Sequence, residues 1–177
     1  QALGVRLVDA DGRDHRRGGA ALARRHRIDA SGLDARIAQC RIDVACDVTN
    51  PLLGPRGASA VFGPQKGATP AMVAELDGCL RRLAEALRRD LGQDVAEVPG
   101  TGAAGGMGAA LLAVLGAKLR PGSEVVADAL GLDAAVREAD LVITGEGRTD
   151  GQTIHGKAPI GVARVAARHG VPVIGLS

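Results

Sequence analysis

The chain has 177 residues, of which 46% are hydrophobic and 24% are charged, and its formal net charge is +2. This length can bury a hydrophobic core as one domain or as part of two, and the composition is ordinary for a globular protein. The charges are dispersed, and the chain has one Phe, no Trp and no Tyr, which argues against a nucleic-acid partner bound by aromatic stacking. The apolar runs are too short to cross a membrane and no secretory signal peptide is recognisable, so we expect no membrane partner.

Cysteines and lysines are both scarce. The cysteines, at positions 40, 46 and 79, are odd in number and lack the spacing of a metal site, which predicts reduced, buried thiols in a cytoplasmic protein. Lys118 is expected at a helix end, where the helix dipole explains a cation. Lys66 and Lys157 instead stand in polar motifs with glycines. We therefore treat these two as candidates for anion binding.

The N-terminal region is expected to contain short elements. Residues 1–9 are typical of a helix end or a strand without a cap, so we expect sequence upstream, and Asp11-Gly12 predicts a turn. Residues 13–27 are strongly basic. They form either a patch that faces an anion or a solvated loop with a short helix, and we favour the loop.

A strand is expected at residues 41–48, because this segment alternates and contains β-branched residues. Asp47 and Asn50 follow at its carboxyl end, where α/β proteins place ligand chemistry. Their side chains are candidates for holding a metal ion or substrate hydroxyls. They are equally suited to an Asx turn before Pro51, and the sequence leaves both interpretations open.

A long helix is predicted to begin at Pro70 with Thr69 as its N-cap, and its apolar residues fall on one face. Gln65 and Lys66 lie just ahead of this helix. A lysine beside a helix N-terminus makes an anion site, although a solvated loop lysine fits the same pattern.

The rest of the chain is organised around its most glycine-rich stretch, residues 98–119. A turn is expected first, and then a helix from Ala103 to a stop at Gly116. The N–H groups at such a helix start suit a phosphate or a carboxylate, which makes Gly102, Gly105 and Gly106 candidate binding residues. The competing interpretation, slightly favoured on this stretch alone, is that the glycines only let the helix pack against another backbone.

The C-terminal part alternates strands and helices. After a turn at Pro121-Gly122 we expect a short strand and helix, followed by a helix at 132–138. Residues 140–144 are typical of a buried strand, residues 159–169 of a helix and residues 173–176 of another strand. Strand, loop, helix and strand in this order imply parallel pairing through a right-handed crossover.

The loop at residues 145–157 holds the densest chemistry of the chain: Glu146, Arg148, Asp150, His155 and Lys157. Carboxylates can hold Mg²⁺, while Arg and Lys can neutralise the oxygens of a transferring phosphoryl group. A structural salt-bridge loop is the competing account. We favour function, because glycines keep the backbone open where the charges concentrate, and we expect the histidine to be a hydrogen-bonding loop residue rather than a base. The sequence contains neither a P-loop nor a dinucleotide-binding fingerprint in a strand context.

Four successive blocks resemble the type 1 glycerate kinase family, in order and with compatible spacing: CDVTNPLLGPRGASAVFGPQKGATP, PGTGAAGGMGAALLAVLGAKLRPG, ADLVITGEGRTDGQTIHGKAPIGVA and VPVIGLS. The resemblance implies ATP-dependent phosphorylation of D-glycerate, with 2-phosphoglycerate favoured as the product over 3-phosphoglycerate, and the sequence leaves the position of phosphorylation open. It also implies a two-domain α/β fold, in which a second α/β domain is inserted into a Rossmann-like domain and the site lies in the cleft between them.

Members of this family are longer at both ends, so the chain resembles the middle of such an enzyme. The resemblance assigns residues 1–137 to the inserted α/β domain and residues 138–177 to part of the Rossmann-like parallel sheet. D-glycerate and a nucleotide are the implied partners. The sequence leaves open whether the protein forms a homodimer.

Within this resemblance, the chemistry of the matching residues suggests their roles, and catalysis would rest on positioning and charge neutralisation. The candidate contacts to phosphate or carboxylate groups are Lys66, Arg148 and Lys157. Asp47 and Asp150 compete for the roles of general base and Mg²⁺ holder, and Glu146 would assist the metal. The remaining candidate binding residues are Asn50, Gln65, Gly102, Gly105, Gly106 and His155.

Two other classes of function stay open. The same loops would bind a sugar acid in a non-catalytic module that uses no ATP, or they would serve a different α/β enzyme that acts on acyl or phospho-sugar substrates. ATP binding distinguishes a kinase from the binding module. Turnover without a nucleotide would identify the other enzyme.

Overall fold

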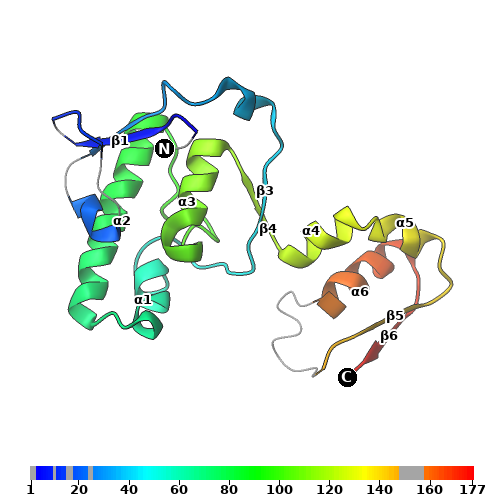
Figure 1. Ribbon diagram of the computed structural model, residues 1–177. Helices are drawn as coiled ribbons and strands as arrows, with labels where there is room; N and C mark the ends of the chain where they lie inside the picture. The colour runs from blue at the N-terminus through cyan, green and yellow to red at the C-terminus, as the bar shows by residue number, and fades with distance from the viewer. Residues whose placement is uncertain (1–2, 10, 15–17, 24–25, 148–157) are drawn as a thin grey trace. The chain divides into compact units, whose positions relative to one another are not determined.

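The computed structural model describes residues 3–9, 11–14, 18–23, 26–147 and 158–177 (Figure 1). The chain is a mixed α/β protein that divides into two compact units, residues 1–119 and 120–177. The domain boundary predicted after Arg137 refers to the domains of the full-length family, and it stays a prediction.

Two short antiparallel strands open the first unit. β1 (Arg6–Asp9) pairs with β2 (His26–Asp29). The predicted turn is confirmed by a hydrogen bond from Gly12 N to Asp9 O at 3.0 Å. Between the strands lies the 3₁₀ helix η1 (Gly19–Ala23), which packs on helix α2. The basic segment thus contains a short helix, as expected, but it also contributes β2, which its sequence does not predict.

The strand expected at 41–48 is shorter in the structure. The 3₁₀ helix η2 (Ala35–Gln39) comes first, and β3 then spans Asp43–Ala45. Its partner β4 (Lys118–Arg120) has 3 residues. A strand this short cannot support a longer ladder, so the predicted length is wrong.

Helix α2 (Pro70–Leu91) confirms the helix predicted at this position. The Thr69 hydroxyl accepts a hydrogen bond from Met72 N at 3.3 Å, and the chain leaves the helix at Gly92 in the left-handed conformation. The apolar face of α2 packs against α1 (Ala58–Phe62) and α3 (Ala103–Leu115). The residues of this core that are buried include Leu52, Leu80, Leu87, Val95 and Ala109.

Helix α3 begins and ends where the sequence predicts, and Gly116 terminates it in the left-handed conformation. Its first turn is nevertheless irregular. Ala104, Gly105 and Gly106 have positive φ angles of 50°, 72° and 98°, so the regular helix starts at Met107.

The second unit is a pair of parallel strands with helices. β5 (Val142–Gly145) pairs with β6 (Val173–Leu176), and α6 (Ala158–His169) packs on both strands, which confirms the predicted parallel pairing (Figure 1). α4 (Gly122–Ala129) and α5 (Leu132–Arg137) pack against α6.

Two expectations for this unit are wrong. No strand precedes α4 after the turn at Pro121, because the valines of this segment lie on a helix that packs against two others. β5 is also not buried on both faces. Val142 and Val173 pack beside α6 in a small core, whereas Ile143 is 62% exposed and Ile174 47% exposed. Helices cover one face of the strand pair in the described residues, so alternate side chains reach solvent.

The three cysteines are free, but their burial differs from the expectation. Cys79 is buried and Cys46 is half-buried, whereas Cys40 is exposed, so the prediction of a buried thiol is wrong at Cys40. Among the described residues, no helix combines the length and the apolar character that a membrane crossing requires.

Candidate functional site

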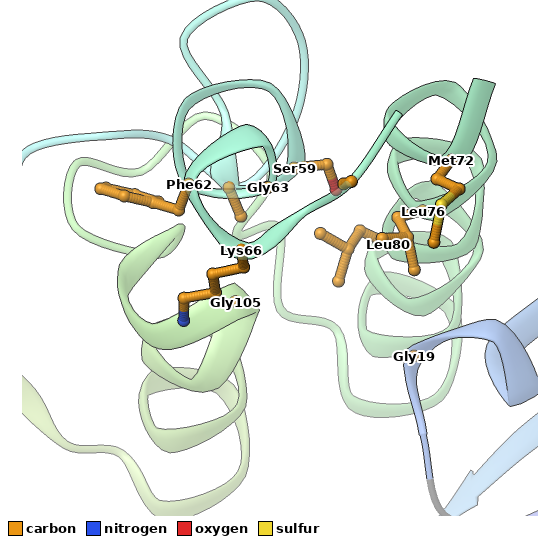
Figure 2. Close-up of a pocket in the computed structure, with 11 residues that line it drawn as sticks. Gly19, Ser59, Phe62, Gly63, Lys66, Met72, Leu76, Leu80 and Gly105 are labelled. Carbon is orange, nitrogen blue, oxygen red and sulfur yellow. The ribbon is translucent and has the colours of Figure 1, made fainter. Parts of the chain in front are cut away.

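A pocket of about 280 Å³ lies in the first unit, between α2 and the segment formed by α1 and η3 (Pro64–Lys66) (Figure 2). Most of the larger side chains that line the pocket are apolar: Phe62, Met72, Leu76 and Leu80. Lys66 is the one charged side chain among the described residues of this lining, and Gly105 is the lining residue from α3.

Lys66 ends η3, directly before Gly67, whose φ of 88° reverses the chain ahead of α2. The Lys66 N–H donates to Gly63 O at 2.9 Å, which fixes the backbone of the lysine, while its side chain stays exposed. In Figure 2 the side chain extends from η3 toward the helix that carries Gly105. The structure therefore brings together two residues that the sequence selects separately, on either side of α2. Gln65 is exposed beside them.

The glycines of the α3 start serve two different purposes. A Cβ at Gly102 would overlap the carbonyl oxygen of Pro51, and one at Gly106 would lie 3.0 Å from a Leu52 methyl and 3.1 Å from a Leu80 methyl. These two glycines allow close packing. A Cβ at Gly105 would meet no atom of the described residues within 4 Å beyond its own turn of helix, so this glycine faces open space beside the pocket. Its φ of 72° is a second reason for glycine at this position.

Ala104 is the one non-glycine residue with positive φ in the part of the chain that the structure describes. This left-handed conformation costs an L-residue roughly 1–2 kcal/mol. Strained backbone of this kind is concentrated at functional sites, where the surrounding structure holds it. Its place directly before Gly105 marks the first turn of α3 as part of the candidate site.

Asn50 anchors the glycine-rich stretch. Its backbone carbonyl accepts hydrogen bonds from Gly100 N at 3.2 Å and Gly102 N at 3.0 Å, and its side-chain amide donates to Arg56 O at 2.8 Å. These bonds brace the segment between β3 and α1 and tie it to the glycine-rich stretch, and they differ from the Asx turn that we considered. Asp47 is exposed after β3. Neither residue lines the pocket in the described structure, and their proposed contacts to substrate stay predictions.

Two buried polar residues at this site were not predicted. Thr101 is 0% exposed, and its hydroxyl donates to Val98 O at 2.6 Å. Ser59 is 6% exposed and lines the pocket. In the sequence, Thr101 stands between two glycines, and Ser59 is the single hydroxyl residue in a segment of small, apolar residues. Both residues support the loops around Lys66 and Gly105.

In the second unit, Glu146 follows the carboxyl end of β5. Its N–H donates to Leu176 O at 3.1 Å, which holds the start of the predicted charged loop against β6. The other four candidates of this loop lie outside the described residues. They are Arg148, Asp150, His155 and Lys157. The described residues contain no group of three or more His, Cys, Asp or Glu residues that could hold a metal ion, so the Mg²⁺ site also stays a prediction.

Two of the carboxylates with lowered pKa values, Asp133 and Asp90, make contacts between elements of the fold. Hydrogen bonding to His169, whose Nε2 lies 2.9 Å from Asp133 Oδ1, lowers the pKa of Asp133. Hydrogen bonding to Arg89 lowers the pKa of Asp90, whose Oδ2 also accepts a bond from Ile28 N at 2.7 Å. Neither carboxylate lines the pocket. The contact of Asp133 with His169 joins α5 to α6, and the contact of Asp90 with Ile28 joins α2 to β2, so both carboxylates hold elements of the fold together.

Comparisons with known proteins cover the whole chain. Residues 1–177 match the model of the glycerate kinase family. The chain is 56% identical to glycerate 2-kinase of Escherichia coli K12 over 177 residues, which are 100% of this chain and 46% of that protein. It is 51% identical to glycerate kinase of Bacillus subtilis 168, again over 100% of this chain and 46% of the relative.

A crystal structure of a protein assigned as glycerate kinase 2 from Salmonella typhimurium LT2 is similar in fold and sequence. It has a TM-score of 0.89 and 62% identity, and the match covers 99% of this chain and 47% of that one. The chain thus spans about half the length of the relatives that it matches.

Proposed function

Because the chain belongs to the glycerate kinase family, we propose that the whole protein transfers the γ-phosphoryl group of ATP to D-glycerate and releases ADP and a phosphoglycerate. The observation that carries this proposal is the match to the family over all 177 residues, at 56% identity to a glycerate 2-kinase. The name of that relative favours 2-phosphoglycerate as the product. ATP is abundant in the cytoplasm, and we propose that compartment for the protein.

The reaction forms a bond between a glycerate hydroxyl oxygen and the γ-phosphorus and breaks the bond from that phosphorus to the β,γ-bridging oxygen. The hydroxyl proton passes to a carboxylate, for which Asp47 and Asp150 are the candidates. Such transfers depend mainly on positioning and on cations that balance the phosphoryl charge. Lys66, Arg148 and Lys157 are the proposed cations.

A bound Mg²⁺ would supply positive charge that balances the phosphate groups of the nucleotide. The proposed holders are Glu146, directly after β5, and Asp150. Oxygen donors of this kind are those that Mg²⁺ prefers. The proposal also includes the architecture of the longer relatives, with residues 1–137 in an inserted domain and residues 138–177 in a Rossmann-like one.

Phosphorus NMR tests the proposal directly. D-glycerate, ATP and Mg²⁺ are incubated with the 177-residue chain and with a chimera that joins it to the flanking segments of the Escherichia coli relative. A phosphoglycerate signal from the chimera is expected, and its chemical shift and proton coupling identify the 2- or 3-position. If neither protein consumes ATP while far-UV circular dichroism shows both folded, the kinase proposal fails, and ligand binding without turnover would favour a sugar-acid binding module.

A further inference from the structure

The Lys66 pocket does not match the acceptor substrate in its chemistry. Each carbon of D-glycerate carries oxygen, so burying the molecule requires polar partners for its hydroxyls and carboxylate. Among the described residues, the larger side chains around the pocket are instead apolar, with one cation, Lys66, and one buried hydroxyl, Ser59. A ligand for this pocket needs a broad apolar surface and a negative charge at one end.

A nucleoside triphosphate has both properties. We propose that this pocket holds the nucleobase end of ATP, with the base against Leu76, Leu80 and Met72 and the Lys66 ammonium on the phosphates. This inference rests on the proposed kinase function. The volume of about 280 Å³ is near the lower limit of small-molecule sites, roughly 300 Å³, so the triphosphate extends from the pocket.

The first turn of α3 gives the ligand room. Gly105 lines the pocket, and apart from its chain neighbours and the nearby backbone of its own helix, no atom of the described residues lies within 4 Å of the position that a Cβ would occupy there. The backbone of α3 therefore reaches the pocket without a side chain in between. In Figure 2 the Lys66 side chain extends away from Met72, Leu76 and Leu80, so phosphates bound to its ammonium would lie outside the apolar walls.

A fluorescent nucleotide makes the proposal measurable. 2-Aminopurine riboside triphosphate is a fluorescent analogue of ATP and serves as the probe. Its anisotropy is expected to rise on binding to the chimera, and adenosine is expected to displace it whereas D-glycerate is not. Displacement by D-glycerate, displacement by tripolyphosphate but not by adenosine, or the absence of binding to an active chimera would each overturn the proposal.

Substitution of Met72 tests the location. Met72 is 48% exposed and lies in the first turn of α2, three residues after the Thr69 cap, where both Glu and Gln complete a capping box. Met72→Glu and Met72→Gln are therefore a matched pair that differs in charge. We expect KM for ATP to be about tenfold higher for Met72→Glu than for Met72→Gln, because a carboxylate repels the phosphates. KM for D-glycerate should be equal in the two variants.

Equal KM values for ATP in the matched pair would refute the pocket assignment and leave the kinase function intact. Lys66→Met tests the phosphate end and the nucleoside end of the ligand separately. It should weaken ATP binding and leave adenosine binding unchanged. A loss of adenosine affinity equal to that of ATP would contradict the assigned orientation. A chimera that binds adenosine in this pocket but makes no phosphoglycerate would refute the proposed function instead.

Discussion

Replacing Gly102 by alanine tests whether this glycine is needed for packing. Its backbone angles, φ −74° and ψ −10°, suit any residue, so a conformational requirement does not explain it. An added Cβ would overlap the carbonyl oxygen of Pro51 and would lie 3.1 Å from Asn50 O. These neighbours are backbone atoms, and they cannot rotate away as a side chain would. The loop that carries Asn50 must therefore shift.

The magnitude follows from what that shift disrupts. Overpacking costs about 1–3 kcal/mol. The hydrogen bonds from Gly100 N and Gly102 N to Asn50 O, at 3.2 and 3.0 Å, are weakened with it, at about 1 kcal/mol each. Alanine recovers about 0.4–1 kcal/mol by restricting the unfolded chain. We expect Gly102→Ala to lower the free energy of unfolding of the first unit by about 2–4 kcal/mol.

The assay is urea unfolding followed by far-UV circular dichroism, since the chain has no Trp or Tyr for fluorescence. Gly78→Ala is the matched control: Gly78 lies within α2 and its added Cβ would meet no atom within 4 Å. This variant should be more stable than the parent chain by about 1 kcal/mol, the helix propensity difference. If both variants unfold at the same urea concentration as the parent, steric packing at Gly102 is not the reason for glycine.

Three further variants test other parts of the structure. Thr69→Ala should destabilise the chain by about 1 kcal/mol through loss of the α2 cap, measured by urea unfolding, and an unchanged midpoint would contradict the capping role. Asp90→Asn weakens the bond to Ile28 N. Because the native pKa of Asp90 is lowered, chiefly by Arg89, its stabilising effect is present above the unfolded pKa of about 3.9 and is lost as pH falls through the native pKa. The free energies of unfolding of parent and variant should therefore differ by about 1 kcal/mol at neutral pH and converge as the pH falls below about 4. A difference that does not change with pH would show that the charge of Asp90 is not the cause of the stabilisation. Lys157→Ala in the chimera should lower kcat about 100-fold with its thermal transition retained, whereas loss of that transition would assign the lysine to structure.

The sequence alone determined the elements that depend on local signals. Thr69, Pro70 and the spaced apolar residues define the start of α2, and Gly116 defines the end of α3. Both are decided within a few residues by side-chain caps and backbone conformation. The parallel pairing of β5 and β6 was also predictable, because a helix between two β-branched strands favours a crossover. Lys66 was selected because lysines are rare in this chain.

Tertiary structure decided what depends on residues distant in the sequence. β3 is short because its partner β4 is short, and alternate residues of β5 are exposed because helices cover one face of the strand pair. The glycines at 102 and 105 are alike in sequence. One lies against the carbonyl of Pro51 and the other faces the space beside Lys66. Glycine spacing gives no information about which backbone approaches from elsewhere, so only the packed structure separates a packing glycine from one that leaves room for a ligand.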